Sequence, residues 1–316
     1  MGAHRESDGL AVTAPLATGT TRPSIYRGES ELDGHRWRQA KNLMMTVTMS
    51  VSVVVVLVPL GFLLGYVIAE GAGIMSIDFL TNDIPIVSRS VGPGMGPAVV
   101  GTLLITGAAA LMAIPLGVLG GIWLNEYGGQ STLARVVRFL SEVMTGVPSI
   151  VMGLFIFTIF VTRNGFSGFA GALALACLML PVVLRTAEEM LRLVPSELRE
   201  ASYALGGRQA RTIGGVILPA AAPGIVSGAL LAVARAAGET APLVVTIAAV
   251  NTINSDLFSG PNTALSAQIF RNATSAFPGP RARAWGAALT LIGIVFVFTI
   301  LARLVTSVFA RRAGGR

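Results

Sequence analysis

Long apolar runs recur along this chain, and they constrain its fold more than any other feature. Six runs lie at residues 44–69, 98–122, 139–161, 168–184, 215–250 and 286–309. Each approaches or exceeds the roughly 20 residues that a helix needs to cross a bilayer. Only 12% of the residues are charged, about half the fraction of an ordinary soluble domain. Because lipid offers no partners for backbone hydrogen bonds, we expect an all-α, polytopic membrane protein with six transmembrane helices.

The fifth run, 215–250, differs from the others. It is too long for a single crossing, and it is interrupted near its middle by Arg235, Gly238, Glu239 and Pro242. One broken helix and two separate segments both fit this pattern, and the second would give seven spans. An ionisable residue inside a span is costly and is by default a candidate functional residue.

Arginine and lysine are distributed unevenly between the connections. With six spans, the N-terminal tail, the second and fourth connections and the C-terminus hold 17 of them, and the other connections hold five. Arg235 is left inside a span. The positive-inside rule then places both termini, and the connection between the fourth and fifth spans, in the cytoplasm.

Composition divides the chain into three parts. Residues 1–42 are polar and show no sustained apolar period, so we expect a disordered cytoplasmic tail. Residues 43–310 form the transmembrane domain, with a polar loop at about 186–214. Residues 311–316 form a short basic cytoplasmic tail.

Missing residue types exclude several kinds of chemistry. The single cysteine, Cys177, rules out disulfides and cysteine-based metal sites within the chain. The two histidines, His4 and His35, lie in the tail, which removes histidine-based triads and metal sites from the spans. Lys41 is the only lysine and follows Ala40, so no G-x-x-x-x-G-K-[ST] phosphate loop of an ATPase exists here. The net charge is +7, but the arginines fall beside the apolar runs and form no continuous basic face, so we expect no nucleic-acid partner.

The polar loop between the fourth and fifth spans has the pattern of a short helix. Pro195 can open this helix, and Gly206 offers a stop. Glu197 and Glu200 suit the positive charge of its first turn. Apolar residues recur on one face, at Leu198, Ala201 and Leu205. A second helical stretch begins near Arg208, so we predict a helix, a glycine turn and a second helix that together present one face to a partner.

One motif in this loop is specific. Glu200-Ala201-Ser202, followed by Gly206 and by Ile217-Leu218-Pro219, resembles the EAA…G…I.LP loop of ABC-transporter permease subunits, whose fold is MetI-like. In that family the helix is a coupling helix that docks onto a separate cytoplasmic ATPase. The resemblance implies that coupling residues of this chain are Glu200, Ala201, Ser202, Leu205 and Gly206. The match departs at Ser202, where the family has a second alanine, but serine is small enough to leave a docking surface.

A wider pattern narrows the resemblance to the permeases of phosphate importers, over roughly residues 44–310. It comprises Leu180-Pro181, Arg185-Thr186, Val194-Pro195, Leu198 to Ala201, Ala204 to Gly206 and Ala234 to Leu243. This pattern is similar to the PstA type, because the paired PstC type typically has Met after Gly-Glu-Thr, where this chain has Ala241-Pro242.

The resemblance to PstA-type permeases also implies a location and partners. The location is the bacterial plasma (inner) membrane, and the substrate is phosphate. The partners are a PstC-like second permease, a PstB-like ATPase dimer and an extracytoplasmic PstS-like phosphate-binding protein. ATP and Mg²⁺ would bind to the ATPase, and this chain itself would bind no cofactor or metal.

Arg235 and Glu239 are the main candidates for a substrate pathway. They are four residues apart, so one helical face can bring them together. We interpret Arg235 as attracting a phosphate oxyanion and Glu239 as tuning or gating that attraction. The alternative is a buried ion pair that only holds the bundle together. Gly238 and Pro242 loosen the same helix, which either exposes backbone amides to an anion or is a packing kink.

Other charged and small residues have simpler expected roles. Arg185, at the cytoplasmic end of the fourth span, guides phosphate at the exit or anchors the span at the membrane interface. Glu126 and Glu142 lie near the ends of spans and are expected to be solvated. Close helix packing, and no binding role, is expected for Gly117, Gly120 and Gly121.

Three other functions fit parts of the sequence. The first is an ABC permease for sulfate, molybdate or phosphonate, since the loop around Glu200 does not read the substrate. The second is an intramembrane enzyme with Glu239 as general acid or base, although no second catalytic group is available within the spans. The third is a scaffold without transport, in which neutralising Arg235 or Glu239 would leave uptake intact.

Overall fold

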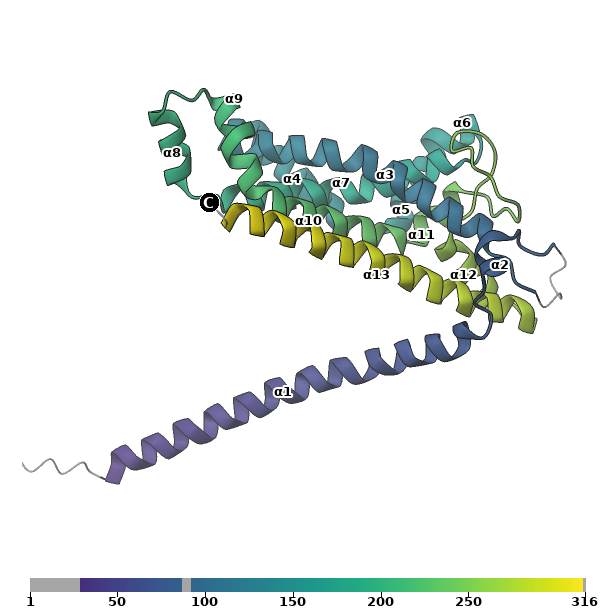
Figure 1. The fold of residues 1–316 in the computed structure, drawn as a ribbon, viewed down its shortest axis with the longest axis horizontal. Coiled ribbons are helices and arrows are strands. Elements are labelled where there is room, and N and C mark those ends of the chain that lie inside the picture. The colour runs from purple at the N-terminus through teal and green to yellow at the C-terminus, as the bar shows by residue number, and fades with distance from the viewer. Residues whose placement is uncertain (1–28, 87–91, 315–316) are drawn as a thin grey trace, which may run out of the picture. The chain divides into compact units, whose positions relative to one another are not determined.

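The computed structural model describes residues 29–86 and 92–314. Within these residues all regular structure is helical, which confirms the expected all-α class. Figure 1 labels the α-helices, and in the text η denotes a π-helix. In order they are α1 (Glu29–Ala72), α2 (Ile77–Thr81), α3 (Gly96–Ile122), η1 (Trp123–Gly128), α4 (Thr132–Gly146), α5 (Ser149–Ile156), η2 (Phe157–Val161), α6 (Thr162–Asn164), α7 (Gly168–Arg192), α8 (Ser196–Ala204), α9 (Gln209–Thr212), η3 (Ile213–Ile217), α10 (Leu218–Ala237), α11 (Ala241–Thr246), α12 (Leu265–Ala273) and α13 (Pro278–Gly314).

The chain divides into two compact units, residues 1–61 and 62–316. The described part of the first unit belongs to α1, and this helix ends in the second unit. We expected a disordered tail through residue 42. Residues 29–42 are instead the first turns of α1, and residues 1–28 lie outside the described residues. All other helices belong to the second unit.

Five helical stretches are long and apolar enough to cross a membrane: Trp37–Ala72, Gly96–Gly128, Gly168–Arg192, Gln209–Ala237 and Pro278–Ser307. They correspond to the predicted first, second, fourth, fifth and sixth spans. The stretches Thr132–Gly146 and Ser149–Asn164 count as a sixth span only as a pair bent by 104°. The described residues thus contain five or six spans, as a polytopic membrane fold requires.

The predicted third span, 139–161, contains a bend that the sequence pattern did not predict. The α-helix stops at Gly146, and Val147 and Pro148 are extended, with ψ of 129° and 134°. A proline disfavours helical backbone at the residue before it, which accounts for the extended Val147. Pro148 also lacks an N–H, but its carbonyl accepts hydrogen bonds from Val151 and Met152, so the chain resumes as α5 in a new direction.

The centre of the second unit is the packing of α3 against α7. Apolar side chains of both helices, including Ile105, Leu175 and Val183, are fully or almost fully buried in one cluster. Two glycines of α3 allow the close approach. A Cβ atom on Gly117 would lie 2.8 Å from the Val183 Cβ, and one on Gly121 would lie 2.6 Å from the Ala187 Cβ. The expected packing role of these glycines is confirmed.

We expect Gly121→Ala to loosen this packing. The added methyl overlaps Ala187 on α7, and overpacking of this kind costs about 1–3 kcal/mol. Gly107→Ala is the matched control, because it lies in the same helix with no atom within 4 Å of an added Cβ. Thermal unfolding of the detergent-purified protein should give a lower midpoint for Gly121→Ala only. Equal midpoints for both variants would contradict the packing role.

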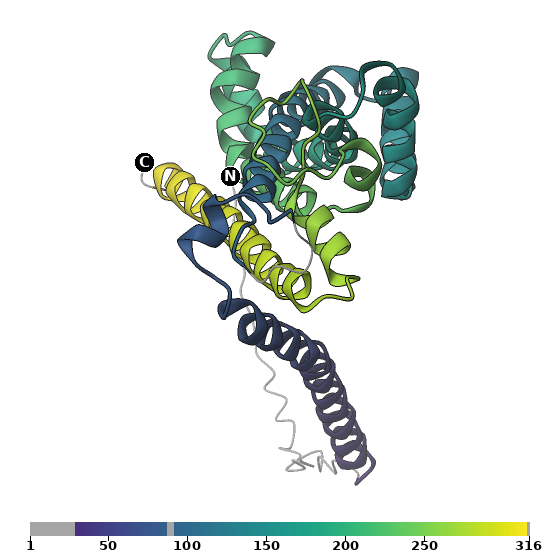
Figure 2. The same ribbon diagram turned by 90° about the vertical axis from the view of Figure 1, so that its right-hand side faces the viewer.

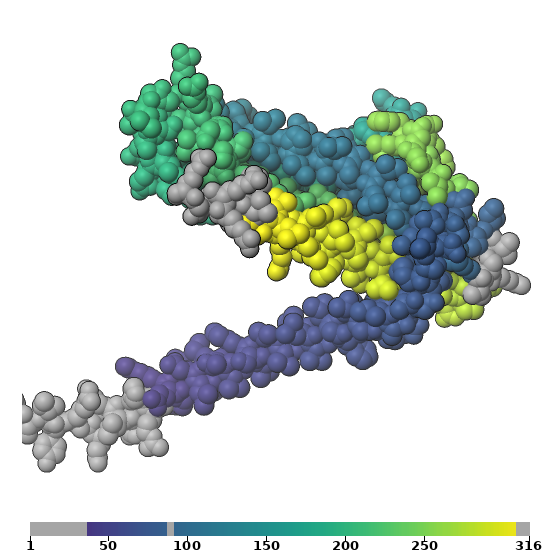
Figure 3. All heavy atoms as spheres, viewed as in Figure 1, coloured from purple at the N-terminus to yellow at the C-terminus, as the bar shows by residue number. Residues whose placement is uncertain are grey.

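The second unit has two distinct ends (Figure 1). The end with α8 and α9 is called the α8 end, and the opposite end, with α2, α6 and α12, is called the α12 end. Figure 2 faces the α12 end and shows the connection between α11 and α12 lying across it. In Figure 3 the green atoms of α8 and α9 project at the α8 end, while α13, in yellow, runs along the visible face.

Candidate functional site

Two broken helices meet in the middle of the second unit. The first break separates α4 from α5 at Val147 and Pro148, and the second separates α10 from α11 at Gly238 to Thr240. Helices α5 and α11 pack closely beyond the breaks: a Cβ on Gly153 would lie 2.7 Å from the Pro242 Cα. Of the two readings of 215–250, the structure has one broken helix, because the six-residue α11 is too short to cross.

A cavity of about 280 Å³ lies beside these breaks. The residues around the first break that line the cavity are Met144, Thr145, Val147, Pro148 and Ser149. Helix α7 contributes Leu178, Met179 and Val182, and the end of α10 with the second break contributes Ala232, Arg235, Ala236 and Glu239. Among these lining residues the ionisable side chains are Arg235 and Glu239, so two of the three predicted pathway residues lie in one cavity.

The two charged groups are close but loosely paired. Arg235 Nε lies 3.7 Å from Glu239 Oε1, and the side chain of Arg235 is 73% exposed while that of Glu239 is 23% exposed. This is the one polar side-chain contact of Arg235 among the described residues. The ion pair is therefore not buried, and exposed pairs contribute only about 0–1 kcal/mol to stability. That exposure argues against a purely structural role.

Backbone amides at the second break are already used. Gly238 N donates to Arg235 O at 3.1 Å, and Glu239 N donates to Ala236 O at 3.1 Å. The carbonyl of Glu239 accepts a hydrogen bond from Ser266 Oγ of α12 at 2.8 Å. These two amides are thus committed to the end of α10, and the side chain of Arg235 is the better anion donor of the break.

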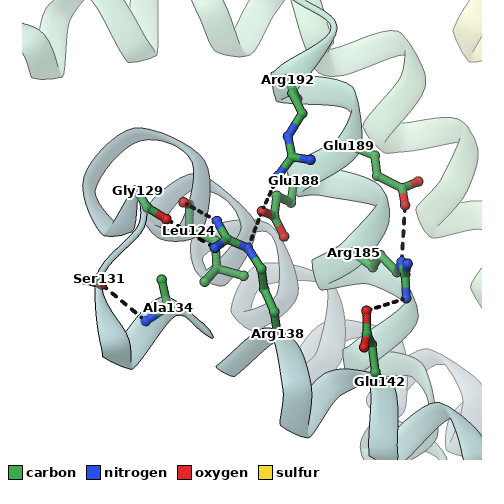
Figure 4. Close-up of polar contacts among 10 residues, drawn as sticks. All are labelled: Leu124, Gly129, Ser131, Ala134, Arg138, Glu142, Arg185, Glu188, Glu189 and Arg192. Carbon is green, nitrogen blue, oxygen red and sulfur yellow. Dashed lines mark hydrogen bonds and ion pairs between the residues drawn. The ribbon is translucent and has the colours of Figure 1, made fainter. Parts of the chain in front are cut away.

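Arg185 lies apart from this cavity, in a cluster of charges between α4 and α7 near the α8 end (Figure 4). Its guanidinium lies 3.4 Å from Glu142 and 3.2 Å from Glu189, and all three side chains are more than half exposed. The expected solvation of Glu142 is confirmed. Arg185 is in helix α7, one turn from Val182 of the cavity lining, but the structure does not bring it together with Arg235.

The same cluster contains a buried carboxylate that sequence reasoning did not single out as a partner. Glu188 is 8% exposed, and it accepts hydrogen bonds from Arg138 Nε at 2.7 Å and Arg192 at 2.9 Å. Arg138 also donates to the carbonyls of Leu124 and Gly129 (Figure 4). Arg138 therefore ties the end of η1 to α4 and α7, and it shares the carboxylate of Glu188 with Arg192.

The short helix that was predicted in the loop between the fourth and fifth spans is present as α8. It begins after Pro195, as expected, and ends before a left-handed Gly206 with φ of +80°. Glu200, Ala201 and Gly206 are exposed, and the side chain of Leu205 is 91% exposed. Ser202 is half-buried instead and shares a hydrogen bond of 2.8 Å with Thr212 Oγ1 of α9. The one departure from the EAA pattern thus fastens α8 to α9.

Glu126 is where the expectation of a solvated residue is wrong. Its side chain is 5% exposed, and it forms an ion pair with Arg199 of α8. The contact joins residues 73 positions apart, so no local pattern could reveal it. The sequence offers one signal for this contact. Glu126 lies at the end of the second apolar run, and Arg199 lies in the polar loop after the fourth run.

Comparison with known proteins identifies the family. Residues 113–314 match the family described as "Binding-protein-dependent transport system inner membrane component". Phosphate transport system permease protein PstA 1 of Mycobacterium tuberculosis is 44% identical over 279 residues, which cover 87% of this chain and 91% of the relative. The PstA protein of Yersinia pestis is 40% identical, with 88% and 94% covered. The chain belongs to this permease family.

A solved structure shares the fold of this chain. The MetNI methionine ABC transporter in an inward-facing conformation contains a chain with a TM-score of 0.56 and 18% identity, covering 66% of this permease and 93% of that chain. The predicted MetI-like fold is therefore confirmed. With its five or six apolar spans, the permease is a multi-pass protein of the bacterial plasma membrane.

Proposed function

We propose that this permease is one half of the membrane pathway of an ATP-driven importer of inorganic phosphate. The observation that carries the proposal is the cavity at the two helix breaks, which presents one exposed arginine beside one carboxylate. The 44% identity to a phosphate transport permease over most of the chain supports phosphate as the substrate. A PstC-like permease would complete the pathway on the open side of the cavity.

Arg235 and Glu239 would act as an exchangeable pair. A guanidinium is always charged and suits the oxygens of phosphate. Because Glu239 lies 3.7 Å away, its carboxylate competes with phosphate for Arg235 and repels the anion. Phosphate would bind while the break holds the two side chains apart, and it would be released when they pair. Arg185 would then guide phosphate toward the α8 end.

Energy for this cycle would come from a separate ATPase. The exposed residues Glu200, Ala201, Leu205 and Gly206 would dock onto a PstB-like ATPase dimer, which binds ATP and Mg²⁺, while the permease itself binds no cofactor. The excess of basic residues supports a cytoplasmic position for α8. The α12 end would then face a PstS-like phosphate-binding protein. Movement of α8 would switch the cavity between outward-facing and inward-facing states.

Uptake of labelled phosphate tests this proposal in cells with and without the gene, at low external phosphate. We expect deletion to remove an ATP-dependent component that excess sulfate, molybdate or phosphonate does not reduce. Restoring the gene on a plasmid is the control. If deletion instead removes uptake of one of these other oxyanions, the chain is a permease with a different substrate. Unchanged uptake of all of them would favour a scaffold.

A further inference from the structure

Glu126 is held at the point where α3 ends near the coupling helix. It lies in η1, and π-helical turns of this kind occur often at functional sites. Its carboxylate pairs with Arg199 and also accepts a hydrogen bond from Asn125 Nδ2 at 2.6 Å. Its backbone carbonyl accepts from Gln209 Nε2 of α9 at 3.0 Å. Both helices of the coupling loop are therefore bound to one residue of η1.

Arg199 makes the matching set of contacts from the side of α8. Besides the ion pair with Glu126, its Nη2 donates to the carbonyl of Leu191 in α7 at 2.9 Å. None of the residues of α8 is buried, so apolar packing alone would attach this helix weakly. The polar contacts of Arg199 and the hydrogen bond between Ser202 and Thr212 therefore carry much of its attachment.

The opposite end of α3 is connected by hydrogen bonds, through α12, to the second helix break beside the cavity. Thr102 Oγ1, near the start of α3, accepts a hydrogen bond from the backbone N–H of Leu265 at 2.8 Å. Leu265 begins α12, and the next residue, Ser266, donates to the carbonyl of Glu239. Thr102 and Ser266 are 2% and 3% exposed. Helix α3 and its extension η1 thus contact the coupling loop at one end. At the other end, α3 contacts α12, which in turn donates a hydrogen bond to the carbonyl of Glu239.

We infer that the pair Glu126 and Arg199 is a latch, through which movement of the coupling helix is passed to α3 and from α3 to the break at Glu239. The inference rests on the proposed transport function. Covalently, α8 continues into α7 on one side and into α9, η3 and α10 on the other, so its own direct link to the end of α3 is this ion pair, reinforced by the hydrogen bond from Gln209 of α9. The side chain of Glu126 is 5% exposed in this pair, and both Glu126 and Arg199 are positioning residues that do not touch the substrate.

The test uses the complete transporter in proteoliposomes with its binding protein. For Glu126→Gln we expect assembly and binding-protein-stimulated ATP hydrolysis within about twofold of wild type, and phosphate transported per ATP reduced at least about tenfold, a usual size for coupling between sites. Glu197→Gln is the matched control, because it removes an exposed carboxylate without an ion pair from α8 itself. The Glu197→Gln transporter should move as much phosphate per ATP as the wild type.

A double variant separates a latch from a merely structural pair. Glu126→Gln combined with Arg199→Gln leaves no unpaired charge, so it should assemble even if a single variant does not. A latch predicts that the double variant loses no more coupling than the worse single variant. A wild-type ratio of phosphate to ATP in Glu126→Gln, or an equal loss of ATP hydrolysis and transport, would overturn the inference. Failure of the wild-type transporter to move phosphate would instead reject the proposed function.

Discussion

Glu239→Gln is expected to abolish most phosphate uptake while the transporter still assembles. Glutamine keeps the size and backbone of Glu239 but cannot compete electrostatically for Arg235. A hydrogen bond to a charged group contributes about 1.5–3 kcal/mol, and 1.4 kcal/mol corresponds to tenfold in affinity. Phosphate would remain bound to Arg235, so the uptake rate should fall at least about tenfold. The measurement is labelled-phosphate uptake together with co-purification of the partner subunits.

Two outcomes would contradict this role of Glu239. Normal uptake by the glutamine variant would show that the carboxylate is not part of the cycle. Loss of assembly would mean that the pair holds the bundle together. The exposure of Arg235, 73%, and the 3.7 Å separation argue against such a structural role. Glu70→Gln is the control, because Glu70 is an exposed glutamate of α1 outside the cavity, and it should retain full uptake.

The second large effect is expected at Gly206, in the turn that follows α8, the proposed coupling helix. Gly206 has φ of +80°, and no atom lies within 4 Å of a Cβ added there. The cost of a side chain therefore comes from the backbone conformation and not from a clash. Left-handed backbone costs an ordinary residue about 1–2 kcal/mol, more for a β-branched one, and asparagine tolerates it best.

Gly206→Val should disrupt the turn that sets α8 against α9. In this turn Gly206 N donates to Tyr203 O and Gly207 N donates to Ser202 O, both at 2.9 Å. We expect the valine variant to lose co-purification of the ATPase together with uptake. Gly206→Asn is the matched variant and should keep most of both. Equal behaviour of the two variants would show that the left-handed turn does not matter for coupling.

The membrane spans could be predicted because a long apolar run is enough to identify a helix that can cross a bilayer. Hydropathy depends on the types of side chain in a segment and carries no information about the direction of its backbone. Prolines at 115, 181 and 223 remain inside helices α3, α7 and α10, whereas Pro148 ends one helix and starts another. Proline is therefore compatible both with a continuous helix and with a break. The sequence does not show which of the two a given proline takes, so the bend at Pro148 is visible only in the fold.

Only part of the candidate site could be predicted from the sequence. Arg235 and Glu239 stand out because charges inside an apolar run are rare, and their spacing brings them together. Glu126 could not be recognised, because a glutamate at the end of a span is ordinarily solvated. Its burial depends on Arg199, which a distant loop brings to it. Local chemistry thus indicated Arg235 and Glu239 as candidates, while the contact between Glu126 and α8 required the fold.

The central claim, that phosphate passes through the cavity at the two helix breaks, is most directly tested by blocking that cavity. In a Cys177→Ser background, Ser149→Cys places the only thiol of the permease in the cavity lining. Ser259→Cys places it in an exposed loop outside the cavity. We predict that a small thiol reagent at position 149 stops phosphate uptake, and that phosphate slows this labelling but not labelling at position 259. Complete labelling at position 149 with undiminished uptake would contradict the account.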